Sequence, residues 1–176
     1  MNETEFLMSM DFGEGEITDA ATMPGRDWPA LTQFCVVVEN RVGSLSRLTQ
    51  HLERHDLRII ALSIVDNIDV AIARVMLDQV ERGRELFELS DFTFFENEVL
   101  GIELPEHPQP FVAVLSTLLQ AEVNVNYMYP LLYRRGGHSS IAVHVEDIDT
   151  ATHVLRDKGF KLISEDDLKN DDEHFG

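Results

Sequence analysis

The feature that most constrains the fold of this chain is an apolar pattern that occurs twice, with about 66 residues between equivalent positions. The apolar character is kept while the residue identities change, and the spacing grows after the second strand, because the turn at 134–137 is longer. A repeat of this length indicates a duplicated domain rather than a solenoid of short units. The aligned apolar positions are Leu45 with Phe111, Leu48 with Val114, Leu52 with Leu118, Leu57 with Val123 and Ile59 with Val125.

Each copy has the pattern of a strand, a helix, two strands, a second helix and a last strand, which is the split βαβ plan. We therefore predict an α+β fold with two ferredoxin-like βαββαβ units, whose antiparallel sheets carry helices on one face. The predicted domains are an acidic N-terminal segment (1–30), the first unit (31–97), the second unit (98–164) and an acidic C-terminal tail (165–176). The expected elements are 31–38, 44–54, 57–65, 70–77, 82–90 and a strand beginning at 92, then 99–104, 110–121, 123–133, 139–145, 149–158 and 161–163.

The composition excludes several classes of protein. With 44% apolar residues the chain can form a core, and it has no apolar run of the roughly 20 residues that a membrane helix needs. The formal net charge is −18, of which −6 falls on residues 1–30 and −5 on 164–176, and no basic stripe is present. Binding to nucleic acid or to an anionic membrane is therefore not expected. An acidic start that lacks a secretory signal pattern, and a single cysteine, Cys35, favour the cytoplasm.

Residues 36–45 read Val-Val-Val-Glu-Asn-Arg-Val-Gly-Ser-Leu, a strand that enters a helix through a short turn. Gly43 permits a tight turn, and Ser44 is expected to be the N-cap of the helix. The N–H groups at a helix start form an anion site. This turn therefore has the chemistry to hold a small carboxylate.

The repeated unit resembles the ACT domain, a ligand-binding module of amino-acid-regulated enzymes. Residues 39–45 are similar to that family's strand-to-helix loop, and Val123-Asn124-Val125 is similar to the start of its second strand. The resemblance covers about residues 31–165. It implies that units pair side by side and hold ligand between the loop of one unit and the second strand of its neighbour.

The two units divide these motifs unevenly. The first has the loop but places Arg58 where the family often has asparagine, whereas the second has Asn124 but carries Gln109 and Pro110 in its loop. We therefore predict one competent site per chain, for an amino acid or similar small carboxylate, and a degenerate mirror-image site. The predicted ligand-binding residues are Asn40, Arg41, Val42, Gly43, Ser44 and Leu45 from the first loop, with Asn124, Val125, Asn126 and Tyr127 from the second strand.

Within that set, backbone N–H groups near residues 42–45 would take the carboxylate, and the carboxamides of Asn40 and Asn124 can meet both carboxylate and ammonium groups. In the alternative interpretation, Asn40 only orders a turn and Asn124 only caps a strand start. Val38 stands where serine-regulated members often have histidine, which puts serine as the ligand in doubt.

Catalytic and metal sites find little support. His51 and His55 have a zinc-compatible spacing, but Glu53 is misplaced for a metalloprotease motif. Cys35 and the serine pair 139–140 lack a nucleophile elbow, and no phosphate-binding glycine loop is present. We therefore expect no enzyme activity, no cofactor and no metal.

Two functions remain open. One is an amino-acid-binding regulatory protein; the other is a constitutive regulatory-subunit or assembly module with a vestigial pocket. Both allow a metabolic enzyme as partner. Open sheet edges predict a homodimer, formed by extended sheets or packed helical faces.

Overall fold

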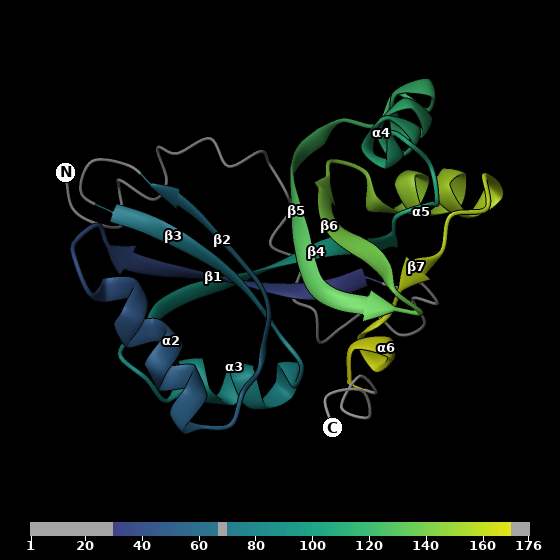
Figure 1. Cartoon of the computed structure of the whole chain (residues 1–176). Helices are drawn as coiled ribbons and strands as arrows, with labels where there is room; N and C mark the ends of the chain where they lie inside the picture. The colour runs from purple at the N-terminus through teal and green to yellow at the C-terminus, as the bar shows by residue number, and fades with distance from the viewer. Residues whose placement is uncertain (1–29, 67–69, 170–176) are drawn as a thin grey trace.

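The structure, a computed structural model, describes residues 30–66 and 70–169 (Figure 1). Its elements follow the predicted order of two consecutive units. The first contains β1 (Ala30–Glu39), α2 (Ser44–Arg54), β2 (Ile59–Asp66), β3 (Val70–Leu77), α3 (Val80–Glu88) and β4 (Thr93–Glu103). The second continues from β4 through α4 (Pro110–Gln120), β5 (Val125–Arg135), β6 (His138–Val145), α5 (Ile148–Asp157) and β7 (Leu162–Ile163), and a short helix α6 (Glu165–Lys169) follows.

The two units share the long strand β4. Its first part pairs antiparallel with β1, from Val37 opposite Thr93 to Ala30 opposite Leu100. Its second part pairs with β6 and with β7. A single sheet therefore runs through both units in the order β2-β3-β1-β4-β6-β5, with β7 beside β4. The predicted fold class of two ferredoxin-like units is confirmed, and the predicted division at residue 97 lies inside this continuous strand.

Each unit builds a core between its helices and one face of the sheet. Because side chains alternate along a strand, the even-numbered residues of β1 and of the second part of β4 face these helices. The first core contains Phe34, Val36 and Val38 with Leu48, Leu52 and residues of β3 and α3. The second contains Leu100, Ile102 and Leu104 with Val114, Leu118 and residues of β6 and α5. The register of the sequence repeat thus holds in both cores.

The helix-free faces of the two halves of the sheet pack on each other. Figure 1 shows α2 and α3 on one side of the molecule and α4 and α5 on the other, with the sheet between them. A third core fills the space inside, and the end strands β2 and β5 contact each other. This inter-unit core consists of residues from both units: Leu31, Ile60, Ala61, Met76, Val99, Tyr129, Leu131, Tyr133, Ala142, Ile163 and Leu168.

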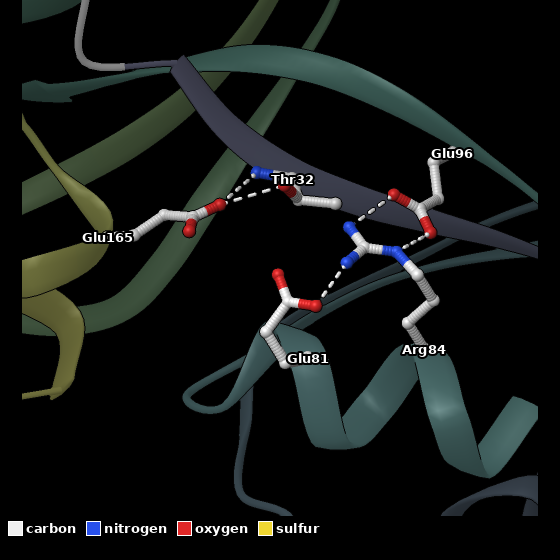
Figure 2. A network of polar contacts seen from close by, with 5 residues as sticks. All are labelled: Thr32, Glu81, Arg84, Glu96 and Glu165. Carbon is white, nitrogen blue, oxygen red and sulfur yellow. Dashed lines mark hydrogen bonds and ion pairs between the residues drawn. The ribbon is translucent and has the colours of Figure 1, made fainter. Parts of the chain in front are cut away.

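Polar contacts join the helices α3 and α6 to the long strands β4 and β1 (Figure 2). The Arg84 guanidinium of α3 donates Nε to Glu96 Oε1 at 2.7 Å and Nη2 to Glu96 Oε2 at 2.9 Å, and it also contacts Glu81. Glu165 of α6 accepts hydrogen bonds from the backbone N–H and the hydroxyl of Thr32 on β1. Residues 165–169, which the sequence suggested to be tail, therefore form a helix that docks on the first unit.

Candidate functional site

The loop between β1 and α2 has the turn that the sequence predicts, with a different cap. Gly43 is the N-cap of α2 and has a left-handed backbone, with φ of +91°. The prediction of Ser44 as N-cap is wrong, because Ser44 is already the first helical residue and its side chain is buried. The Ser44 N–H instead donates to the Arg41 carbonyl at 3.2 Å, and the Arg41 N–H donates to the Glu39 carbonyl at 2.8 Å.

This loop presents backbone donors to open space. The Arg47 N–H donates to the Gly43 carbonyl, so helix geometry leaves the N–H groups of Leu45 and Ser46 without an intrahelical acceptor. The side chain of Val42 is fully exposed, and a Cβ added at Gly43 would meet nothing within 4 Å. The first turn of α2 contains no acidic residue. The helix start is therefore open to an anion, as the sequence suggested.

The corresponding loop of the second unit has another backbone. Its N-cap, Gln109, has a negative φ of −132° with ψ of 72°, and Pro110 occupies the first turn of α4. The Gln109 N–H donates to the ring of His107 at 3.0 Å. This loop and the β5–β6 hairpin border an open hollow of about 590 Å³, with Pro110 and Phe111 on one side and Pro130 on another. Proline removes one donor from this helix start, and His107 engages another.

The residues predicted from the second strand lie at or near the polar contacts between the two units, which involve Gln33, Tyr127 and Tyr129 and are called the seam below. The Asn124 carboxamide donates to Asn126 Oδ1 at 3.2 Å, and Asn126 Nδ2 lies 3.0 Å from His144 Nδ1. Val125 is half-buried and packs against the second core. The Tyr127 hydroxyl accepts a hydrogen bond from Gln33 Nε2 at 2.9 Å. Tyr127 therefore reaches the first unit through a hydrogen bond. Asn124 and Asn126 are exposed and hydrogen-bond within the second unit, where the ring of His144 stacks on that of Tyr127.

Gln33 and Arg74, which the sequence reasoning missed, complete this seam. Gln33 is fully buried and also accepts a hydrogen bond from the Tyr129 hydroxyl. The Arg74 guanidinium lies 3.6 Å from the centroid of the Tyr127 ring, a cation–π contact. The signal for Gln33 was a polar residue inside an apolar strand, Leu-Thr-Gln-Phe-Cys. The same signal marks Arg74, which is the one charged residue of the apolar strand Val-Ala-Ile-Ala-Arg-Val-Met-Leu.

Burial sets the protonation of the seam. It raises the pKa of Tyr127, although hydrogen bonds from Asn97 and Gln33 act in the opposite direction. It also raises the pKa of the Cys35 thiol to about 11. Burial first, and Arg74 second, lower the pKa of His144. At neutral pH the side chains of Tyr127, Cys35 and His144 are therefore uncharged, and the charged group that acts on all three is the Arg74 guanidinium.

The structure does not bring the two predicted sets of residues together. Tyr127 contacts Gln33, whereas the loop begins after Glu39, about 20 Å further along β1 at the usual rise of a strand. Figure 1 shows the β1–α2 loop at the outer end of the first unit, well separated from the start of β5. Within one chain, a single amino acid cannot span this distance. The site predicted from both sets of residues therefore stays a prediction, because the arrangement within one chain does not bring the two sets together.

The candidates for other chemistry have structural contacts. His51 Nε2 lies 2.8 Å from Ser90 Oγ, and its ring packs on those of His55 and Phe92. Residues 30–66 and 70–169 contain no cluster of three histidine, cysteine or acidic side chains that could hold a metal ion. No helix in this part of the chain is long and apolar enough to cross a bilayer.

The chain matches a known sequence family and known folds. The family model of the ACT domain pair matches residues 30–171. The crystal structure of protein BT0572 from Bacteroides thetaiotaomicron has a TM-score of 0.74 at 23% identity, and the match covers 82% of this chain and 99% of that chain. The ligand-free regulatory subunit of aspartate kinase from Thermus thermophilus has a TM-score of 0.52 at 9% identity, with 77% and 96% covered. No curated protein sequence matches the chain.

Proposed function

Because this chain belongs to the ACT domain pair family, we propose that it is a regulatory protein that binds a free amino acid or a similar small carboxylate and catalyses no reaction itself. ACT domains are ligand-binding regulatory modules, which supports the general role. The similar fold of a subunit described as regulatory, that of aspartate kinase, is consistent with it.

The observation that carries this proposal is the open helix start at Gly43. Gly43 has a left-handed backbone with open space beside it, and the N–H groups of Leu45 and Ser46 that follow have no intrahelical acceptor. A carboxylate placed there would accept hydrogen bonds from both N–H groups and gain from the positive end of the helix dipole. Charged acceptors at such donors contribute roughly 1.5–3 kcal/mol for each hydrogen bond.

Asn40 gives this site its selectivity in the proposal. Its exposed carboxamide lies in the same turn as Gly43 and can accept from an ammonium group while the helix start holds the carboxylate. An α-amino acid carries both groups one carbon apart, so it fits the pair better than a simple carboxylate does. Arg41 forms an ion pair with Glu39, which leaves the recognition to Asn40 and the backbone.

Residues 124–127 enter the proposal as the part of the chain that responds to ligand. Tyr127 hydrogen-bonds to Gln33 of the first unit, and Asn126 is connected to Tyr127 through His144, whose ring stacks on that of Tyr127. Ligand at the β1–α2 loop shifts the relative arrangement of the units only if the two arrangements bind ligand with different affinity. A metabolic enzyme bound to the chain would sense that shift.

Isothermal titration calorimetry with each free amino acid tests the proposal. We expect saturable binding of at least one amino acid to the wild type, and a loss of at least tenfold in affinity in Gly43→Ala and Asn40→Ala. Gly159→Ala is the matched control, because Gly159 also has a left-handed backbone, with φ of +80°, and open space around it. It should lose similar stability and keep full affinity.

The same titration separates the alternative function. A constitutive assembly module with a vestigial pocket would give no heat with any amino acid. It would also give identical behaviour for Asn40→Ala and the wild type, and that result contradicts the proposed ligand-binding role.

A further inference from the structure

Helix α4 has an apolar outer face, unlike its counterpart in the first unit. Helices α2 and α4 each span eleven residues and begin at equivalent positions of the repeat, Ser44 and Pro110. Their buried positions correspond as well, because Leu48 and Leu52 match Val114 and Leu118. The two helices therefore occupy equivalent places, and their outward faces can be compared position by position.

At the equivalent outward positions the side chains are polar on α2 and apolar on α4. Where α2 has Ser46, Thr49 and Glu53, α4 has Val112, Leu115 and Leu119. The exposed fractions on α4 are 44% for Phe111, 56% for Val112, 38% for Leu115 and 76% for Leu119.

None of the eleven residues of α4 is charged, in a chain with a net charge of −18. The four exposed side chains present on the order of 400 Å² of surface, which is within the range of the largest apolar patch on a typical monomer, a patch that is often functional. It is about half of what one partner contributes to a standard interface.

We propose that the outer face of α4 is the contact surface of a symmetric homodimer. Two acidic copies repel each other over most of their surface, and the uncharged face of α4 is where they can meet without opposed like charges. The end strands β2 and β5 contact each other within the chain, which favours a helical face over these two edges for association.

The face is also complementary to itself. Phe111, Leu115 and Leu119 are spaced four positions apart and form one ridge along the helix, which can pack beside the same ridge of a copy. A two-fold axis at Leu115 brings the protruding Leu119 of each copy to the Phe111 end of the other. There the hollow of about 590 Å³, walled by Pro110, Phe111 and Pro130, can receive it.

Sedimentation velocity of the full chain tests this dimer. The informative variant is Leu115→Thr/Leu119→Glu, which gives α4 the residues that α2 carries at these positions. It should fold normally, as judged by circular dichroism and thermal unfolding. We expect the wild type to sediment as two chains and this variant as one, with a dimer Kd raised at least about a hundredfold.

Leu89→Glu is the matched control. Leu89 is 89% exposed and lies at the end of α3 in the first unit, so this variant should keep the wild-type mass. A wild type that sediments as one chain overturns the proposal, and so does a double variant that keeps the mass of two chains. A third outcome also overturns the proposal. If the wild type is a monomer, and removal of residues 1–29 makes the α4 amides exchange hydrogen faster, the face is covered by that segment instead of by a second copy. This test is independent of ligand binding at the β1–α2 loop.

Discussion

The loops that enter α2 and α4 occupy the same place in the two units but differ in backbone and chemistry. Gly43 has a left-handed conformation, whereas Gln109, its equivalent in the second unit, has a negative φ and precedes Pro110. The first loop presents N–H donors to open space, and the second engages one donor with His107 and loses another to proline. The two units therefore share one fold, while the start of α2 alone of these two helices leaves its N–H donors open for the proposed carboxylate.

The comparison extends to the outward faces of the same two helices. The first unit keeps a polar helix face and an open loop, and the second has a closed loop and an apolar helix face. The two proposals together account for both differences, because in them the first unit binds ligand and the second holds the dimer together. The predictions below test how far the two units are equivalent and where they differ.

The largest expected change in the free energy of unfolding concerns the hydrophobic cores, which the two units build in the same way. Leu52 and Leu118 occupy equivalent core positions and are almost completely buried. Leu52→Ala and Leu118→Ala should each lower the free energy of unfolding by about 2–5 kcal/mol, because each leaves a cavity. Urea denaturation measures both. A cost within this range in one unit, with almost none in the other, would show that the two cores are not equivalent.

A smaller change in the free energy of unfolding is expected at the seam, where the two units have different residues. Gln33 is buried and binds the hydroxyls of Tyr127 and Tyr129, while the equivalent residue of the second unit is the buried Val99. Gln33→Val should lower the free energy of unfolding by about 1–3 kcal/mol, because it leaves the buried Tyr129 hydroxyl without its acceptor and leaves the Tyr127 hydroxyl with only its hydrogen bond from Asn97. Adding Tyr129→Phe should recover part of this loss. If the double variant is no more stable than Gln33→Val, the hydrogen bond between Gln33 and Tyr129 does not contribute to stability.

The loops themselves should differ by about 1 kcal/mol, because only one of them has a left-handed backbone. Gly43→Ala places a Cβ on that backbone and should cost roughly 1–2 kcal/mol. Gln109→Ala, on a backbone with negative φ, should change the free energy of unfolding by less than about 0.5 kcal/mol. Thermal unfolding of the two variants compares them. Equal costs would mean that the backbones of the two loops do not differ in solution as they do in the structure.

The smallest effect is a dependence on pH that each unit contributes through one histidine. Burial is the main cause that lowers the pKa of both His51 and His144 from 6.5. The unfolded chain then binds protons more readily, so stability is full above pH 6.5 and decreases as the pH falls below it. Urea denaturation between pH 7.5 and 5 should show this decrease, and His144→Gln should make it shallower. An unchanged slope in that variant would exclude His144 as a contributor.

The sequence predicted the elements and the duplication because both depend on local apolar periodicity. The helices from Ser44 and from Pro110 begin where the pattern placed them, and the alternation of β1 and β4 matches the two cores. The continuous strand β4 was not predicted, because Glu96, Asn97 and Glu98 interrupt the apolar pattern between Phe95 and Val99. Pairing with β1, a long-range contact, extends the strand through these residues.

The loop of the candidate site was predicted, but it was expected beside the second strand of the other unit, from which it is separated within one chain. Glycine before a helix is a local signal, so the turn at Gly43 could be predicted from its residues. The packing of the two helix-free faces depends on tertiary contacts such as those of Gln33 with Tyr127 and Tyr129. It places Tyr127 against the middle of β1 rather than near the loop, and no local pattern in the sequence reports that.

The measurement that tests the central claim most directly is the response of backbone amides to a free amino acid. A ¹⁵N-labelled full chain is titrated with the amino acid that gives the strongest calorimetric signal, or with glycine if none does, and the amide resonances are followed. We predict saturable shifts of the Leu45 and Ser46 amides and none of the Phe111 and Val112 amides at the start of α4. Shifts confined to the second loop, or no saturable shift at Leu45 and Ser46 with any amino acid, would contradict the account.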